Sequence, residues 1–265
     1  MNLSISNLAW NVERNEVVYA LMQKYGFIGL EIAPTKIFPN EPYSHISQTS
    51  EWVKDLHKEC GFCVPSMQSI WFGRTGKIFG TEEERKILLD YTKSAIDFAS
   101  VIDCKNLVFG CPKNRCIPED GSFENCNKIA IDFFKQLGDY AFSKETCIGM
   151  EANPPIYGTN FVNTTEEALV LIKEVDSDGF KLNLDVGTMI QNNEGIENLK
   201  KNVALINHVH ISEPFLKKIE KRNLHNELIH LLKSENYKGF VSIEMGLQDS
   251  VCDIEDVLKY VKELI

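Results

Sequence analysis

Short apolar, β-branched runs alternate with longer amphipathic runs along the whole chain. The short runs have the length of strands, and the longer ones repeat apolar residues every three to four positions, as helices do. We predict strands at 3–8, 27–32, 63–68, 106–109, 147–151, 180–185, 206–212 and 239–245. The helices predicted between them cover about 13–24, 50–60, 82–100, 123–143, 165–174, 195–202, 223–234 and 254–264.

This order predicts the α/β fold class. Eight strand–helix units fit into 265 residues, so each unit has about 33 residues, enough for a strand, a crossover helix and two loops. We therefore predict a single (β/α)8 TIM barrel, with residues 1–265 as one domain. A doubly wound sheet is the competing fold, but it usually has a glycine-rich turn after its first strand. No such turn follows Leu8.

Charge and composition narrow the possible binding partners and cellular locations of the protein. Lys and Arg number 28 against 38 Asp and Glu, a net charge of −10, which disfavours nucleic acid because phosphate binding depends on clustered cations. The chain has no long apolar run and no basic, apolar leader, so we expect neither a membrane span nor secretion. We expect a cytoplasmic protein whose eight cysteines stay reduced.

Polar side chains end four consecutive predicted strands. Alternation of faces along a strand directs these side chains to the barrel axis and their apolar neighbours to the helices. The four are separated by 34, 25 and 34 residues, close to one strand–helix unit each: Glu151, Asp185, His210 and Glu244. Since active sites of such barrels lie at the carboxyl ends of the strands, this pattern indicates a functional site.

The chemistry of these four residues predicts a metal centre. Three carboxylates that converge in a partly dry site repel one another, and a divalent cation removes that repulsion. Three oxygen donors and one imidazole suit Mn²⁺, Co²⁺, Mg²⁺ or Zn²⁺. We expect His208, one layer deeper on the same face, to have a core or supporting role.

Other strand ends supply candidates for substrate binding. Glu31 and Gln68 end the second and third strands facing inward, and Trp71 follows soon after. Lys113 and Arg115 follow the fourth strand, where they could meet an anionic or hydroxylated substrate or form a salt bridge on an exposed loop.

Five segments that contain these residues resemble the xylose isomerase-like TIM-barrel superfamily, and more narrowly its sugar phosphate isomerase/epimerase group with the ketose 3-epimerases. The segments are GLEIAP, MEANP, LNLDVG, HVHISEP and VSIEMG, in that order along most of the chain. The resemblance implies that Glu151, Asp185, His210 and Glu244 bind the metal. It also implies that Glu151 and Glu244 are the catalytic acid/base pair, and that the protein is a homodimer or homotetramer acting on a sugar or sugar phosphate.

The implied reaction moves a proton next to a carbonyl through a metal-stabilised enediolate. Two positions depart from the ketose 3-epimerases. Thr188 stands where a substrate-binding His is usual, and the stretch after the metal His keeps Glu213 but has Lys217 or Lys218 near the usual Arg. The resemblance makes Thr188 and Glu213 further candidates for substrate binding. The sequence leaves open which sugar is the substrate, and whether the reaction is epimerisation or isomerisation.

Three other functions compete with a sugar epimerase or isomerase. A dehydratase or isomerase of inositol-type ketones would use similar chemistry, and the Thr at 188 favours it. A catalytically altered barrel that only binds sugar would also explain Thr188, but the intact glutamate pair argues against it. Endonuclease IV belongs to the same superfamily, yet its additional metal-binding histidines on the early strands have no counterpart at Glu31 and Gln68.

Overall fold

A parallel sheet at the centre of the molecule carries the site. The structure is a computed structural model, and it describes residues 1–265. Its seven strands are β1 (Asn2–Ser6), β2 (Gly29–Glu31), β3 (Leu107–Phe109), β4 (Ile148–Met150), β5 (Phe180–Asp185), β6 (Ile206–Ser212) and β7 (Phe240–Glu244). They pair in the order β2-β1-β7-β6-β5-β4-β3, and every pair is parallel. All carboxyl ends therefore lie at one edge of the sheet.

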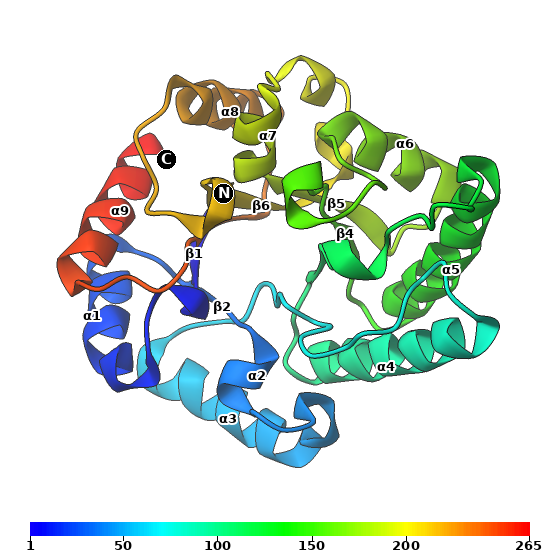
Figure 1. Ribbon diagram of the computed structural model, residues 1–265. Coiled ribbons are helices and arrows are strands. Elements are labelled where there is room, and N and C mark those ends of the chain that lie inside the picture. The colour runs from blue at the N-terminus through cyan, green and yellow to red at the C-terminus, as the bar shows by residue number, and fades with distance from the viewer.

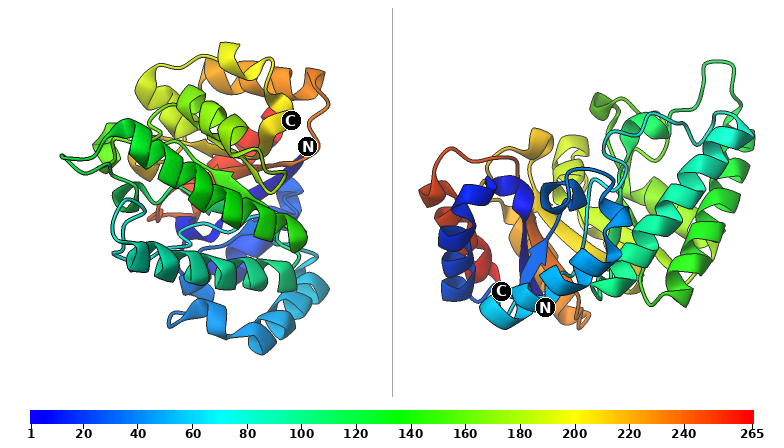
Figure 2. Two further views of the ribbon diagram at one scale, coloured as in Figure 1. Left: turned by 90° about the vertical axis from the view of Figure 1, so that its right-hand side faces the viewer. Right: turned by 90° about the horizontal axis from the view of Figure 1, so that it is seen from below.

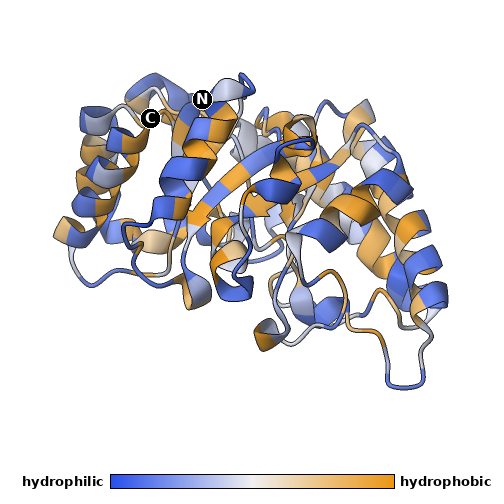
Figure 3. Cartoon of the chain, turned by 90° about the horizontal axis from the view of Figure 1, so that it is seen from above, coloured by the Kyte–Doolittle hydropathy of each residue, from blue (hydrophilic) through white to orange (hydrophobic).

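Helices surround these strands on the outside (Figure 1). They are α1 (Asn15–Tyr25), α2 (Pro34–Ile37), α3 (Ile46–Cys60), α4 (Glu82–Val101), α5 (Phe123–Ser143), α6 (Thr165–Val175), α7 (Val186–Asn192), α8 (Asn223–Ser234) and α9 (Val251–Leu264). Hydrophobic and hydrophilic residues alternate around the helices (Figure 3), as expected for helices that cover a sheet with one face. Both chain ends lie close together at one end of the molecule (Figure 2).

The segment predicted as the third strand differs from the others. Residues 63–68 form isolated parallel bridges, from Cys63 to Gly29 and from Met67 to both Ile32 and Leu107. The segment thus lies between β2 and β3 without a continuous ladder. Pro65 explains the interruption, because proline has no backbone N–H to donate.

One predicted helix is wrong. Residues 195–202 form no α-helix; the 3₁₀ turns Glu197–Leu199 and Val203–Leu205 lie there and just beyond instead. The helix of this unit, α7, begins directly after β5, because the Asp185 side chain accepts the backbone N–H of Thr188 at 2.6 Å and so caps it. The sequence places Asp185 at the end of a strand, and its second role as a helix cap is not visible there.

No helix in the structure is both long enough and apolar enough to cross a membrane.

Candidate metal centre

Four side chains with metal-binding chemistry stand at the carboxyl ends of four neighbouring strands. Glu151 directly follows β4, Asp185 ends β5, His210 lies near the end of β6, and Glu244 ends β7. These strands are adjacent in the sheet. The structure therefore brings together the four residues that the strand-end pattern selects.

The register between β5 and β6 decides which of these side chains face each other. Asp185 pairs with His210, after a register shift of one residue at Leu182/Asn183. With an unshifted register, Asp185 would lie opposite Val209, whose side chain points to the other face. The register shift thus directs the imidazole toward the carboxylates. Such irregularities in strand pairing are common next to functional sites.

The imidazole of His210 lies at the centre of the cluster. Its Nδ1 is 3.2 Å from Oε1 of Glu151 and 3.1 Å from Oε2 of Glu244. Asp185 accepts a hydrogen bond from the hydroxyl of Ser212 in addition to the backbone N–H of Thr188. One donor atom from each of Glu151, Asp185, His210 and Glu244 lies within 4.8 Å of the others.

Burial makes the negative charges of this cluster costly. It raises the pKa of Asp185 to about 6, helped by the charge of Glu151, and it also raises the pKa of Glu151 and of Glu244. Burial by itself lowers the pKa of His210, but the charges of Glu244 and Glu31 hold that pKa well above its ordinary value. The protein alone therefore does not neutralise the three carboxylates.

A divalent cation fits this donor set. Oxygen and nitrogen ligands bind such ions at about 2.0–2.6 Å, so donors around one ion lie at most about 5 Å apart. The mutual separation of up to 4.8 Å meets that limit. Three carboxylates and one imidazole supply the negative charge and the hard donors that Mn²⁺, Co²⁺, Mg²⁺ and Zn²⁺ accept.

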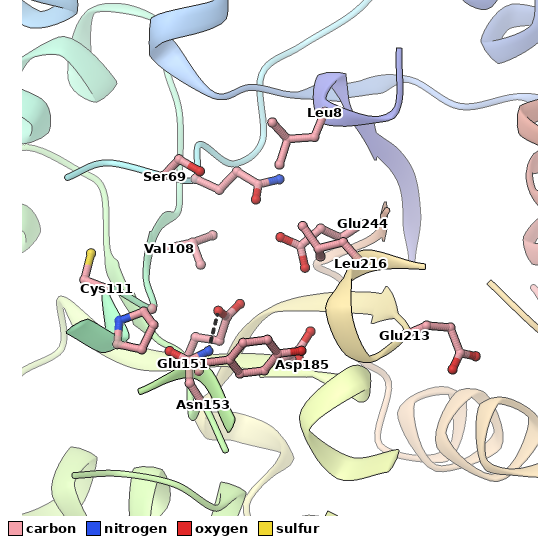
Figure 4. Close-up of a pocket in the computed structure, with 14 residues that line it drawn as sticks. Leu8, Ser69, Val108, Cys111, Glu151, Asn153, Asp185, Glu213, Leu216 and Glu244 are labelled. Atoms are coloured by element: carbon pink, nitrogen blue, oxygen red, sulfur yellow. Dashed lines mark hydrogen bonds between the residues drawn. The ribbon is translucent and has the colours of Figure 1, made fainter. Parts of the chain in front are cut away.

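A cavity of about 230 Å³ opens onto the cluster. Five of the site residues proposed from the sequence line this cavity: Gln68, Glu151, Asp185, Glu213 and Glu244. The other lining residues are Leu8, Ser69, Val108, Gly110, Cys111, Pro112, Asn153, Tyr157 and Leu216. Four of the fourteen lining residues are acids, and none is Lys, Arg or His. Glu151 and Glu244 enter it from different strands, whereas the Glu213 side chain points away from the centre (Figure 4).

Glu31 lies beneath the cluster and does not line the cavity. Its carboxylate is fully buried and contacts Nε2 of both His208 and His210, at 2.8 and 2.9 Å. Burial opposes its charge, yet the two histidines hold its pKa far below the ordinary value. Glu31 thus forms an ion pair or hydrogen bond with the histidines rather than presenting its oxygens to the cavity.

The two predicted cations do not reach the cavity. Arg115 is completely buried, and its guanidinium donates to the backbone carbonyls of Gly110, Glu151, Phe161 and Val162 and to the Asn153 side chain. It therefore holds the two loops after β3 and β4 together. Lys113 lies on the exposed surface and is absent from the cavity lining.

Trp71 and Thr188 are also placed away from the cavity. The Trp71 indole N–H donates to the hydroxyl of Thr92 at 2.8 Å, and its ring packs edge-on against Phe109. The buried Thr188 hydroxyl donates to the carbonyl of Ala152 at 2.8 Å. Both side chains support the walls of the site.

Sequence reasoning misses two residues that shape the site. Arg222, which lies twelve positions after His210 in the sequence, donates two hydrogen bonds of 2.6 Å to the Glu213 carboxylate. Tyr157 lines the cavity and accepts the backbone N–H of Phe215 at 2.8 Å, joining the loops after β4 and β6. Neither residue lies at a strand end, so the alternation of strand faces could not select it.

Several solved structures share this fold. The 3-keto-D-glucoside 4-epimerase from E. coli is 22% identical, with a TM-score of 0.78 over 99% of each chain. D-psicose 3-epimerase with D-tagatose, from Clostridium cellulolyticum H10, is 14% identical, with a TM-score of 0.78 over 100% of this chain and 99% of that chain. Both neighbours are sugar epimerases, a class of isomerase.

A third neighbour has a different name. The AP endonuclease, family 2, from Brucella melitensis is 21% identical, with a TM-score of 0.72 over 98% of each chain. At these identities the similarities establish the fold and leave the activity open. The comparison with proteins of curated function gives no match.

The sequence itself matches the family described as xylose isomerase-like TIM barrel over residues 19–264. This match covers most of the chain and includes all four residues of the cluster. It confirms the resemblance that the strand-end segments indicate. The chain therefore belongs to the xylose isomerase-like TIM barrel family.

Proposed function

We propose that this protein is a divalent-metal-dependent sugar epimerase or isomerase that moves a proton on a carbon next to a carbonyl. The convergence of Glu151, Asp185, His210 and Glu244 beside one cavity carries this proposal. The printed names of two structural neighbours, a 3-keto-D-glucoside 4-epimerase and a D-psicose 3-epimerase, support the choice of a sugar.

The four residues of the cluster would hold the metal, with Mn²⁺, Co²⁺, Mg²⁺ and Zn²⁺ as the candidates. When bound, the cation would stabilise the negative charge that develops on the substrate's carbonyl oxygen. Ser212 and the backbone N–H of Thr188 orient the Asp185 carboxylate, and Asn183 orients that of Glu151 through a hydrogen bond of 2.8 Å. These contacts hold the ligands in place before a substrate arrives.

Glu151 and Glu244 would transfer the proton. Glu151 follows β4 and Glu244 ends β7, with β5 and β6 between these strands. We therefore expect the two side chains to approach the substrate from different sides. One carboxylate removes the proton from carbon, and the other carboxyl group returns a proton to the opposite face, which inverts that centre. Return of the proton to the neighbouring carbon would give isomerisation instead. Burial raises the pKa of both groups toward the range in which a carboxyl can accept and donate protons.

The charge of the cavity supports an uncharged sugar over a sugar phosphate. A phosphate group is normally bound by Arg, Lys or oriented backbone N–H groups, and the lining contains four acids and no cationic side chain. Arg115 already donates to backbone carbonyls. The same argument supports a small sugar over nucleic acid.

Among the predicted substrate-binding residues, Gln68 is best placed for that role. Its Nε2 donates to Ser6 and Glu31, at 2.6 and 2.8 Å, and its Oε1 is left to accept from a substrate hydroxyl. Glu213 also lines the cavity, but Arg222 holds its carboxylate, so we propose that it fixes the loop after β6.

We further propose that residues 63–68 take the place of an eighth strand and complete the barrel, with residues 1–265 as one domain. The bridges of this segment to both β2 and β3 support the first part. One cluster of 67 buried hydrophobic residues, which runs from Leu3 to Val261, supports the second. All eight cysteines are free, in keeping with a cytoplasmic location. A homodimer or homotetramer is the assembly that the resemblance implies.

Dehydration of an inositol-type ketone is the second candidate, favoured by one observation. Thr188 stands where the ketose 3-epimerases usually have a substrate-binding His, and its hydroxyl is engaged with Ala152. The contacts to the substrate therefore differ from those of a ketose 3-epimerase, while the metal ligands and the glutamate pair are the same.

Hydrogen exchange from D₂O tests the proposal. We expect the Mn²⁺-loaded protein to incorporate deuterium next to the carbonyl of at least one uncharged ketose or keto-glycoside from a panel, and not into the corresponding phosphates. The position of the label, read by NMR, separates epimerisation from isomerisation, and loss of water from an inositol-type ketone would identify a dehydratase. The His210→Ala variant serves as a control. A metal-loaded protein that exchanges no proton in any of these compounds would contradict the proposed enzyme.

A further inference from the structure

A second layer of titratable groups lies directly under the proposed metal centre. It consists of Glu31, from the end of β2, and His208 and His210, from β6. All three side chains are completely or almost completely buried. One oxygen of Glu31 accepts hydrogen bonds from Gln68 Nε2, at 2.8 Å, and from His210 Nε2, at 2.9 Å. The other oxygen accepts from His208 Nε2 at 2.8 Å.

These contacts keep a hydrogen on Nε2 of His210. A carboxylate only accepts hydrogen bonds, so the Nε2 that faces Glu31 must be the N–H nitrogen. The opposite nitrogen, Nδ1, faces Glu151 and Glu244, the two carboxylates that would share the cation, so a bound cation would take the place of any hydrogen on Nδ1. A metal ligand must offer a free lone pair, and with hydrogen kept on Nε2 the lone pair of the neutral ring is on Nδ1.

The amide of Asn183 supports the same assignment from the other side of the ring. Its Oδ1 accepts from Nδ2 of Asn106 at 3.2 Å, so its own Nδ2 is the end that faces Glu151, at 2.8 Å, and Nδ1 of His210, at 3.3 Å. An amide nitrogen only donates. Nε2 of His210 thus faces only the acceptor Glu31, whereas Nδ1 faces the amide donor of Asn183 together with the two carboxylates that would hold the cation.

We propose that Glu31 is a positioning residue of the metal centre: it holds the Nε2–H of His210 and thereby commits Nδ1 to the metal. This inference rests on the proposed function, in which the cluster above holds a divalent cation. Glu31 does not line the cavity, so it acts through the imidazole and makes no contact with the substrate. Carboxylates that accept the second N–H of a metal-binding histidine fix the ring and strengthen it as a ligand.

The lower layer could itself be a metal site, because Glu31, His208 and His210 also bring three donor atoms within 4.8 Å of one another. The separations of 2.8 and 2.9 Å between the Glu31 oxygens and the imidazole nitrogens are ordinary hydrogen-bond lengths. Both oxygens of Glu31 have partners without any ion. The positioning role therefore requires one metal ion per chain, in the upper layer.

The test measures Mn²⁺ binding to the full chain after the metal has been removed with a chelator. Free Mn²⁺, followed by electron paramagnetic resonance, gives both the stoichiometry and Kd. For Glu31→Gln, which keeps the shape and removes the charge, we expect Kd to rise by about 10–100-fold. For Glu31→Asp, which keeps the carboxylate, we expect a smaller rise.

A matched control removes a buried imidazole contact elsewhere. The hydroxyl of Tyr260, on α9, forms a hydrogen bond of 2.9 Å with Nδ1 of the buried His225, on α8. Both residues lie outside the cluster. In Tyr260→Phe we expect an unchanged Kd. Thermal unfolding of each metal-free variant shows that it is folded, and the Glu31→Asp variant keeps the test valid if Glu31→Gln does not fold.

A spectroscopic measurement tests the orientation of the ring directly. In the Zn²⁺-loaded protein, ¹⁵N NMR of the histidines should find the hydrogen of His210 on Nε2. Hydrogen on Nδ1, an equal Kd for Glu31→Gln and wild type, or two ions per chain would each overturn the role of Glu31. A wild-type chain that binds no divalent ion would overturn the proposed function as well.

Discussion

The imidazole of His210 joins two layers of acids, and each of its nitrogens faces a carboxylate. Nδ1 lies beside Glu151 and Glu244, and Nε2 lies beside Glu31. Strand alternation predicts that all of these side chains face inward. It does not predict their depth, which depends on how each strand is shifted against its neighbours. Alternation alone therefore predicts a substrate contact for Glu31, whereas the structure places it under His210.

The glutamate pair gives the first prediction at this scale. In Glu151→Gln or Glu244→Gln, proton exchange into the substrate should fall by about 10²–10⁴-fold, because an amide cannot act as a general base. The rate of deuterium incorporation measures this, with metal content determined in parallel since both residues are also proposed ligands. The exposed Glu235→Gln is the control. Wild-type exchange rates in both metal-loaded variants would refute the acid/base role.

Acid should remove the metal. Burial raises the pKa of Asp185 from 3.8 to about 6, and the pKa values of Glu151 and Glu244 are raised as well. A metal must displace these protons, so its affinity should fall as the pH drops through about 6, where Asp185 gains its proton, by about tenfold per pH unit for each proton displaced. Titration of Mn²⁺ at pH 7.5 and 5 measures the change. An affinity that is the same at both pH values would contradict the assignment of these ligands.

The same pKa shift has the opposite effect on the metal-free fold. The folded chain binds the Asp185 proton more tightly than the unfolded chain does, so this group favours folding at low pH. That contribution is fully present below pH about 4 and is lost as the pH rises through about 6. Metal-free and metal-loaded protein should therefore differ most in stability at neutral pH.

Long elements follow the sequence more closely than short ones. The ranges of α5, α8, β5 and β6 agree with their predicted ranges, because each shows a clear period of apolar positions over its whole length. The four-residue α2 was not predicted, since one turn shows no period. The sequence pattern predicts a helix at residues 195–202, but the helix of this unit is α7, which begins earlier, at the Asp185 cap.

The N-terminus of α6 supplies a prediction about stability. The Thr164 hydroxyl accepts the backbone N–H of Glu167 at 3.2 Å, and the Glu167 carboxylate accepts that of Thr164 at 3.3 Å, a capping box. Thr164→Ala should lower the free energy of unfolding by about 1 kcal/mol, measured by urea denaturation. Thr75→Ala, at an exposed position, is the matched control. Equal losses in the two variants would show that the cap contributes nothing.

At the scale of the whole molecule, the parallel sheet gathers the site from distant parts of the chain. β2 and β6 are far apart in sequence, yet Glu31 and His210 lie in contact across the interior. The sheet order places β1 and β7 between them on one side. The site therefore depends on the pairing of strands that are distant in the sequence.

Metal should stabilise the whole fold, because the cluster exists only in the folded chain. At a free Mn²⁺ concentration 100 times Kd, we expect a gain of about 2.7 kcal/mol in the free energy of unfolding. Thermal unfolding with and without chelator measures the gain as a higher Tm. The His210→Ala variant should lose most of the shift. A Tm that does not respond to Mn²⁺, Co²⁺, Mg²⁺ or Zn²⁺ would argue against the site.

The sequence by itself determined the α/β class, the order of the elements and the four residues at the strand ends. It could do so because alternation along a strand is a local property that needs no knowledge of neighbouring strands. The tertiary structure alone decided that Pro65 interrupts a ladder, that β5 and β6 shift by one residue, and that Arg115 faces carbonyls. These features depend on register and depth, which are set when distant segments pack together.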